Sequence, residues 1–222
     1  MKLQNTQHSS PAETNTQLLF DAIASDLVNQ GYSIQLNALA AEITADLFRY
    51  VKDMPVQQFE RAGVGREQAH QLNHSVRSDQ ICWIANDFDE GRRWLQWAGE
   101  LQDFLNRRLF LGLFSFESHF SHYRSGDFYQ KHSDAFKGES NRILSLVYYL
   151  NPEWVPSDGG ELVLYPINET DPCQVTPSFG TLVIFLSEEM PHEVLKSHRD
   201  RYSIAGWYRV NTSTSERIDP PS

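Results

Sequence analysis

Three side chains in the second half of the sequence could bind a transition metal together: His132, Asp134 and His192. His132 and Asp134 form a His-x-Asp motif after a strand-like run, and His192 follows at the expected end of a later strand. Two imidazoles and one carboxylate suit Fe(II), because they occupy one face of its octahedron and leave the opposite positions open for a chelating co-substrate and dioxygen. The types and order of these residues therefore predict a non-haem iron oxygenase site.

A second His-x-Asp motif, His198-Arg199-Asp200, shows that the motif alone has little specificity. It lies among Lys, Ser and Arg residues that are typical of a turn, and no further histidine follows it. The first copy differs because strands are expected on both sides of it and because a third ligand is available. We therefore interpret only the first copy as metal-binding.

Arg201 supplies the fourth chemical group of the predicted site. It opens the segment 202–208, in which every second side chain is expected to point into a barrel. A buried guanidinium needs a partner, and its forked donors fit a carboxylate in a bidentate manner. We expect this anion to be the distal carboxylate of 2-oxoglutarate, whose other end chelates iron. A solvated arginine at the start of a strand is the alternative.

The elements that position these residues come in the order helices first, strands afterwards. Apolar residues recur at helical spacing within 16–52, where Asn37 is expected to cap the second helix, and within 90–110. The pattern then changes to short strands separated by turns, at 114–123, 145–150, 161–165, 181–185 and 202–210. This predicts an α+β fold, a double-stranded β-helix (jelly roll) with N-terminal supporting helices.

We expect one oxygenase domain at 16–210, because 222 residues with 40% hydrophobic content can bury one sizeable core. The barrel core is expected at 113–210. The segment 60–80 has no sustained periodicity and is expected to be a mobile loop, either a flap over the substrate or plain flexible chain. The polar segments 1–15 and 211–222 are expected to be flexible tails.

Charge and composition argue against several classes of function. A net charge of −10 with 19 scattered Lys and Arg residues disfavours nucleic-acid binding. No apolar run is long enough to span a membrane and the N-terminus lacks the apolar core of a signal peptide, so we expect a cytoplasmic protein. Cys82 and Cys173 have no metal-like spacing and are expected to be reduced thiols.

With these residues in place, the sequence resembles the 2-oxoglutarate- and Fe(II)-dependent oxygenases. More narrowly, it resembles the prolyl 4-hydroxylases of the hypoxia-inducible-factor type and their bacterial relatives. The blocks that match occur in the family's order within residues 75–210, at 77–84, 123–134, 148–151, 159–162, 191–194 and 201–207. Together these blocks are more specific than the metal motif alone.

The resemblance implies a role for residues in the centre of the site. It implies that His132, Asp134 and His192 ligate iron. It also implies that Arg201 and the Tyr149 hydroxyl bind the distal carboxylate of 2-oxoglutarate. Tyr123 is implied to contact the oxoglutarate end near the metal. Core packing with a satisfied hydroxyl is the alternative for Tyr149.

The resemblance also implies contacts around the entrance, where an extended target peptide would lie. The residues concerned are Arg77, Asp79, Tyr129, Arg142 and Trp207. Arg77 and Asp79 match the end of the family's mobile loop, and a pair of opposite charges two residues apart could pin that loop. Ordinary barrel packing is the alternative for the three others.

The reaction that the resemblance implies is hydroxylation of a prolyl residue at C4 in a protein substrate. Fe(II) would be the cofactor and 2-oxoglutarate and O2 the co-substrates, with release of succinate and CO2; ascorbate binding is also compatible. The implied partner is a protein that presents a proline loop, with elongation factor Tu as the candidate. Residues 61–76 show no match to the animal enzymes, which leaves the target open.

Three alternatives stay open. The same chemistry could act on a small molecule such as free proline, although such an enzyme has less use for a broad loop at 60–80. A non-catalytic sensor could bind metal or oxoglutarate and act through a partner, but the complete set of ligands argues against it. A cupin could use the same ligands without oxoglutarate, and would then have no partner for Arg201.

Overall fold

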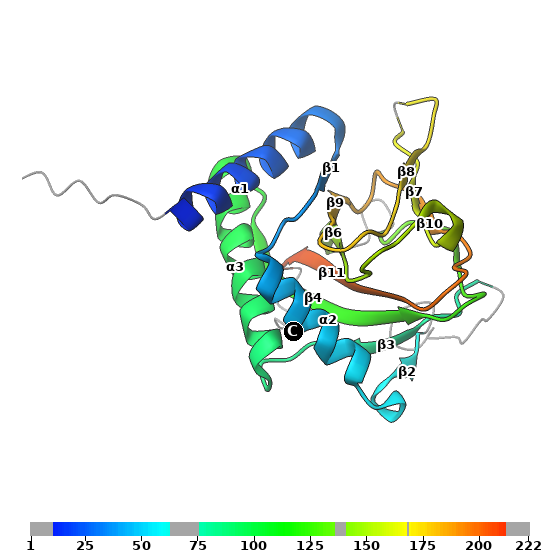
Figure 1. Cartoon of the computed structure of the whole chain (residues 1–222). Helices are drawn as coiled ribbons and strands as arrows, with labels where there is room; N and C mark the ends of the chain where they lie inside the picture. The colour runs from blue at the N-terminus through cyan, green and yellow to red at the C-terminus, as the bar shows by residue number, and fades with distance from the viewer. Residues whose placement is uncertain (1–10, 63–75, 136–140, 168, 212–222) are drawn as a thin grey trace, which may run out of the picture.

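The structure is a computed structural model that describes residues 11–62, 76–135, 141–167 and 169–211. Helices lie on one side of a pair of antiparallel sheets (Figure 1). The described helices are α1 (Pro11–Gln30), α2 (Ala41–Asp53) and α3 (Asp89–Leu109), with short 3-10 helices at Val56–Gln58 and Pro156–Asp158.

Two sheets form the barrel, and their neighbouring strands are far apart in the sequence. The larger sheet has the order β1-β9-β6-β11-β4-β3-β2, and the smaller has the order β5-β10-β7-β8. Because the chain passes repeatedly from one sheet to the other, the arrangement is the predicted jelly roll. The strands are β1 (Tyr32–Gln35), β2 (Glu60–Arg61), β3 (Gln80–Trp83), β4 (Leu113–Tyr123), β5 (Tyr129–His132), β6 (Arg142–Tyr149), β7 (Leu162–Leu164), β8 (Cys173–Val175), β9 (Leu182–Leu186), β10 (His192–Val194) and β11 (Arg201–Val210).

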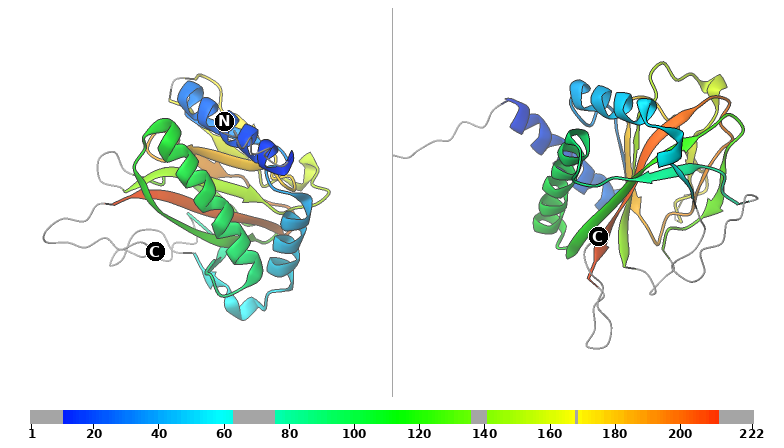
Figure 2. Two further views of the ribbon diagram at one scale, coloured as in Figure 1. Left: turned by 90° about the vertical axis from the view of Figure 1, so that its left-hand side faces the viewer. Right: turned by 90° about the horizontal axis from the view of Figure 1, so that it is seen from below.

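The helices cover the outer face of the larger sheet (Figure 2). Trp94 of α3 is fully buried there, and its indole N–H donates to Ser118 Oγ of β4 at 3.0 Å. From β11, the Tyr208 hydroxyl donates to the Ala98 carbonyl at 2.9 Å. These bonds satisfy polar atoms that burial would otherwise leave unpaired, so apolar burial can fix α3 on the sheet without penalty. None of the helices in the described part of the chain is long and apolar enough to cross a membrane.

The inner face of the larger sheet and the smaller sheet enclose a second core. Adjacent residues of β6 show the division, because Tyr148 packs with the helices whereas Tyr149 packs between the sheets. Ile184 and Phe185 of β9 divide in the same way. Successive side chains of a strand point to opposite faces, so every second residue of the central strands points inward. Polar side chains from β4, β6 and β11 can therefore share one interior.

The observed strands extend the predicted pattern in the smaller sheet. The long predicted strands 114–123 and 202–210 match β4 and β11 to within one residue. In contrast, β5, β8 and β10 were not predicted as strands. Each has only three or four residues, too few for a period-two pattern to be recognised, and pairing with neighbouring strands defines them instead.

Two boundaries near the N-terminus differ from the prediction. α1 begins at Pro11, so the helix includes residues 11–15 of the predicted tail. Proline is favourable in the first turn of a helix because a backbone N–H at that position would have no hydrogen-bond acceptor within the helix. The prediction that Asn37 caps the second helix is wrong. It has a left-handed φ of 52°, and α2 begins after Ala40.

Candidate active site

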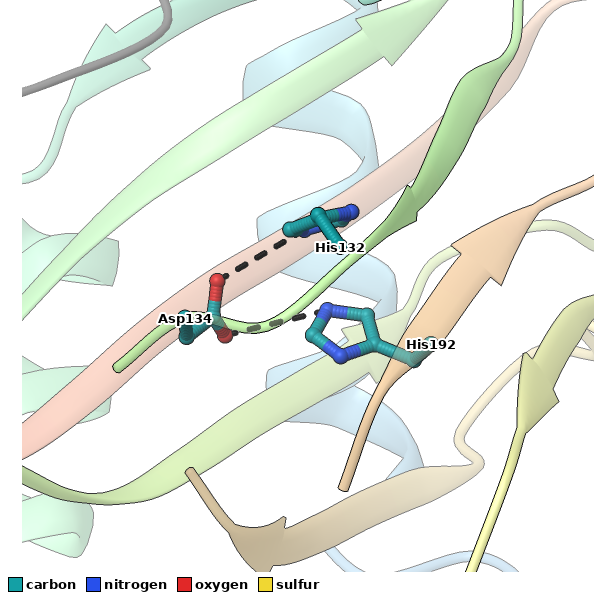
Figure 3. Close-up of side chains that lie close together, drawn as sticks. All are labelled: His132, Asp134 and His192. Atoms are coloured by element: carbon teal, nitrogen blue, oxygen red, sulfur yellow. Dashed lines mark ion pairs between the residues drawn. The ribbon is translucent and has the colours of Figure 1, made fainter. Parts of the chain in front are cut away.

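His132, Asp134 and His192 come together in the interior, as their types predicted. The two histidines lie directly opposite each other in the pairing of β5 with β10. Asp134 follows β5 and places its oxygens 3.6 Å from His132 Nε2 and 3.8 Å from His192 Nε2. One ligand atom from each residue lies within 4.8 Å of the others, a group that could hold a metal ion (Figure 3).

Backbone carbonyls orient both imidazoles. His132 Nδ1 lies 2.8 Å from the Gln130 carbonyl oxygen, and His192 Nδ1 lies 3.0 Å from that of Met190. Because a carbonyl only accepts, each Nδ1 carries the hydrogen, which leaves the lone pair on Nε2 facing Asp134. Burial lowers the pKa of His192 despite the opposing charge of Asp134, so this imidazole is neutral at pH 7. Neutral imidazoles held in this way are suited to bind a metal.

Asp134 accepts a hydrogen bond from a serine that was not predicted as a site residue. Ser145 of β6 donates from Oγ to Asp134 Oδ2 at 2.7 Å, and Ser187 Oγ lies 2.9 Å from Ser145 Oγ. Burial raises the pKa of Asp134, but the two imidazoles and the serine outweigh this effect and hold the pKa well below its ordinary value. Asp134 is therefore an anion. The alternation along 145–150 could have identified Ser145 as an inward residue.

The second His-x-Asp motif lies apart from this group. His198 is exposed at a bend, and Asp200 pairs instead with His122 Nε2 at 3.3 Å. Neither residue belongs to the metal-binding group found among the described residues. The interpretation of this copy as part of a turn agrees with its position.

Arg201, the first residue of β11, is 1% exposed and lies beside two tyrosine rings. Its Cζ is 4.9 Å from the ring centre of Tyr123 and 5.0 Å from that of Tyr149. Nε donates to the Gly160 carbonyl at 2.8 Å, and Nη1 donates to Ser203 Oγ at 3.3 Å. Arg201 Nη2 and the Tyr149 hydroxyl are buried without a hydrogen-bond partner among the described residues. Two unpaired donors beside a buried cation fit a carboxylate.

Both tyrosine hydroxyls retain their hydrogens. Burial raises the pKa of Tyr149 to about 12, opposed in part by the charge of Arg201. Burial also raises the pKa of Tyr123 well above its ordinary value. A protonated hydroxyl can donate to an anion, so the two rings provide hydrogen-bond donors as well as a surface for the guanidinium.

Gly160 allows the backbone to approach Arg201 closely. It has a φ of 69°, which favours glycine, and a Cβ at this position would lie 3.0 Å from Arg201 Cδ and 3.2 Å from Ser197 Oγ. The Gly-Gly-Glu block singled out in the sequence therefore contributes to the site through its backbone.

Arg77 and Asp79, which directly precede β3, form an ion pair with two hydrogen bonds. Nε donates to Oδ1 at 2.5 Å and Nη2 to Oδ2 at 2.9 Å, and Asp79 is fully buried. The Arg77 guanidinium carbon also lies 4.7 Å from the centre of the Tyr129 ring. This ring stacks on the imidazole of His132, with ring centres 3.6 Å apart. The ion pair is thus linked through Tyr129 to the first imidazole. Residues 63–75, most of the predicted mobile loop, lie outside the described residues.

Arg142 and Trp207 are stacked, with the guanidinium carbon 3.8 Å from the ring centre. Glu117 accepts from Arg142 Nη2 at 2.9 Å and from Arg209 Nη1 at 3.2 Å. Trp207 also contacts His119, with ring centres 5.4 Å apart. Glu117 and His119 were not predicted as site residues, although the alternation along β4 places both on the inward face.

His119 is expected to make the fold less stable in mild acid. Its ring is 1% exposed, and its pKa falls from 6.5 to about 3, chiefly through burial and then through the charge of Arg77. The folded protein therefore keeps the imidazole neutral, whereas the unfolded chain gains a proton as the pH falls below 6.5. Protonation of the unfolded chain favours unfolding. The free energy of unfolding is therefore highest above pH 6.5 and falls progressively toward pH 3.

Denaturant unfolding at pH 7 and pH 5 tests this expectation. The contribution of His119 should lower the free energy of unfolding by about 2 kcal/mol between these values. His119→Gln should lose this part of the pH dependence, whereas His198→Gln, which removes an exposed imidazole, should keep it. An unchanged pH dependence in His119→Gln would contradict the assignment.

Comparison of the chain with known protein families and solved structures identifies the class of protein to which this fold and site belong. The profile of the 2OG-Fe(II) oxygenase superfamily matches residues 118–209. The crystal structure of a Pseudomonas putida prolyl-4-hydroxylase is 35% identical, with a TM-score of 0.78, and the match covers 86% of this chain and 98% of that one. The chain belongs to the 2OG-Fe(II) oxygenase superfamily, which uses Fe(II) and 2-oxoglutarate with O2.

Within this superfamily the chain is homologous to prolyl hydroxylases. Prolyl hydroxylase EGLN3 of Mus musculus is 31% identical over 161 residues, which cover 67% of this chain and 62% of the mouse protein. A Caenorhabditis elegans hypoxia-inducible factor prolyl hydroxylase is 37% identical over 86 residues, 38% of this chain and 12% of the nematode protein. The chain thus spans less than two thirds of the length of these relatives.

Another relative was solved with a peptide. It is the prolyl hydroxylase in complex with a hypoxia inducible factor oxygen degradation domain peptide fragment from Trichoplax adhaerens. It is 28% identical with a TM-score of 0.77, and the match covers 92% of this chain and 94% of that one. The similarity therefore includes the helices as well as the barrel.

Proposed function

We propose that this protein hydroxylates a prolyl residue at C4 in a protein substrate, with 2-oxoglutarate and O2 as co-substrates and succinate and CO2 as products. The observation that carries the proposal is the pair of unpaired buried donors, Arg201 Nη2 and the Tyr149 hydroxyl. Tyr149 belongs to the same inner core as Phe185, whose ring centre lies 4.8 Å from that of His192. A cupin that worked without oxoglutarate would have no use for these donors.

The proposed roles follow from the donor set. His132, Asp134 and His192 would bind Fe(II), which supplies the oxidative chemistry that couples decarboxylation of 2-oxoglutarate to hydroxylation. Arg201 and Tyr149 would bind the distal carboxylate, and Tyr123 would contact the oxoglutarate end near the metal. Burial strengthens this ion pair and keeps water away from it, so the protein contributes chiefly placement of the co-substrate and a dry interior.

The proposed substrate is a protein segment, which would lie along the entrance. Arg77, Asp79, Tyr129, Arg142 and Trp207 are proposed to contact it. Aromatic rings and guanidinium groups suit an extended, proline-containing peptide, and the Trichoplax adhaerens relative was solved with a peptide fragment. Elongation factor Tu is the proposed partner.

The described cysteines are free thiols, which supports a cytoplasmic location.

The test is a search for the product. Anaerobically purified protein is supplied with Fe(II), 2-oxoglutarate and O2 together with a cytosolic protein extract, and mass spectrometry follows prolines that gain one oxygen atom. A modified proline, stoichiometric succinate and the loss of both in His132→Ala are the expected results. Succinate without a modified protein would move the substrate to small molecules such as free proline. Neither product would favour a non-catalytic sensor.

A further inference from the structure

Glu117 lies between two arginines on the wall of the barrel. One carboxylate oxygen accepts from Arg142 at 2.9 Å and the other accepts from Arg209 at 3.2 Å, so both oxygens are used. The side chains of the three residues are only 14–21% exposed. At this burial, charge-assisted hydrogen bonds with defined geometry hold side chains more firmly than a solvated surface pair does.

The two arginines lie opposite each other on paired strands, so an anion between them is needed to reduce their repulsion. Arg142 of β6 and Arg209 of β11 are cross-strand partners. Like charges directly opposite each other destabilise a sheet and push the side chains apart. Glu117 on β4 reduces this repulsion and leaves the cluster with one net positive charge. Its carboxylate also fixes the Arg142 guanidinium where it stacks, 3.8 Å from the centre of the Trp207 ring.

Trp207 connects this cluster to the metal site. It pairs with Glu117 of β4 on one side and with Ser145 of β6 on the other, and Ser145 donates to Asp134. Trp207 is 7% exposed, and its Nε1 is buried without a hydrogen-bond partner among the described residues. A buried indole N–H without a partner is costly, so a ligand that brings an acceptor would be favoured there. A peptide carbonyl is such an acceptor.

We infer that Glu117 is a positioning residue for the protein substrate. It holds Arg142 flat on Trp207, and this keeps the indole fixed so that Nε1 can donate to a backbone carbonyl of the target segment beside the metal site. The inference rests on the proposed function. It concerns binding of the peptide and not of 2-oxoglutarate, because the contacts of Arg201 involve other residues.

The test compares carboxylate variants for peptide binding and turnover. A library of short proline-containing peptides first identifies one that the wild-type enzyme hydroxylates. For Glu117→Gln, the KM for this peptide should rise about tenfold, as expected for loss of a hydrogen bond to a charged group, while kcat and the KM for 2-oxoglutarate stay unchanged. Fluorescence anisotropy of the labelled peptide, measured with 2-oxoglutarate but without O2, should show the same loss of affinity. Glu117→Asp should recover part of it.

Asp46 provides a matched control on the opposite face of the larger sheet. It is likewise held by two arginines, Arg49 at 3.0 Å and Arg93 at 2.8 Å, but in the helical layer. Asp46→Asn should bind and hydroxylate the peptide as the wild type does. Unchanged peptide affinity in Glu117→Gln, or an equal loss in Asp46→Asn, would overturn the inference while the proposed function stands. A wild-type enzyme that hydroxylates no peptide of the library and no protein of the cytosolic extract would overturn the proposed function, and the inference with it.

Discussion

His192→Ala should lose metal binding and all turnover of 2-oxoglutarate. The imidazole is one of three ligands in a preformed group, and its Nε2 is already oriented toward Asp134 by the Met190 carbonyl. Loss of hydrogen bonds in the surrounding shell alone typically weakens metal binding by about 10- to 100-fold, so removal of a ligand should exceed about 100-fold. Anaerobic titration with Fe(II), followed by calorimetry, measures the affinity, and succinate formation measures turnover.

Two further variants make this result specific. Ser145→Ala keeps all three ligands but removes the hydrogen bond to Asp134, so it should weaken metal binding by about tenfold. His198→Ala removes the histidine of the second His-x-Asp motif, and it should bind metal and turn over 2-oxoglutarate like the wild type. Wild-type metal affinity in His192→Ala would refute the assignment. A loss in His198→Ala would show that this motif had been misjudged.

Arg201→Ala should raise the KM for 2-oxoglutarate by at least about 30-fold, because truncating one partner of a buried charge pair costs roughly 2–5 kcal/mol. Arg201→Lys keeps the charge but loses the fork, so it should give an intermediate effect. Tyr149→Phe removes only the unpaired hydroxyl and should raise the KM about tenfold. Kinetics of succinate formation over a range of 2-oxoglutarate concentrations distinguish the three variants.

The binding of pyruvate separates a loss of recognition from a loss of folding. Pyruvate has the 2-oxo acid group of 2-oxoglutarate but lacks the distal carboxylate, so its affinity for the metal-loaded protein should not change when Tyr149 is replaced by Phe. Thermal unfolding of each variant monitors the fold. If Arg201→Ala unfolds, the Lys and Phe variants still decide the question. A wild-type KM for 2-oxoglutarate in both of them would refute the proposed carboxylate site.

The sequence sufficed to predict the chemistry of the site because its strongest signals are local. His132-Ser133-Asp134 follows a strand-like run, and Arg201 opens an alternating segment, so residue type and spacing along the chain sufficed to predict a role for each. The long strands and the helices were also predictable, because many residues contribute to each periodic pattern. The α+β jelly roll follows from their order.

Other parts of the site depend on contacts that the sequence does not encode locally. β5 and β10 are too short to show a pattern, yet their pairing places His132 opposite His192. Glu117 and Ser145 lie on the inward faces of their strands, but alternation gives only the face. It cannot tell that Glu117 meets two arginines from other strands or that Ser145 reaches Asp134.

Residue types and their spacing thus predicted which groups would bind a metal and a dicarboxylate. Only the tertiary structure showed that β5 and β10 pair and bring the three predicted ligands together, and which buried donors lack a partner in the described residues: Arg201 Nη2, Tyr149 Oη and Trp207 Nε1. The physical reason is that burial and hydrogen-bond satisfaction depend on every element packed around an atom. They are fixed only when strands far apart in the chain come together.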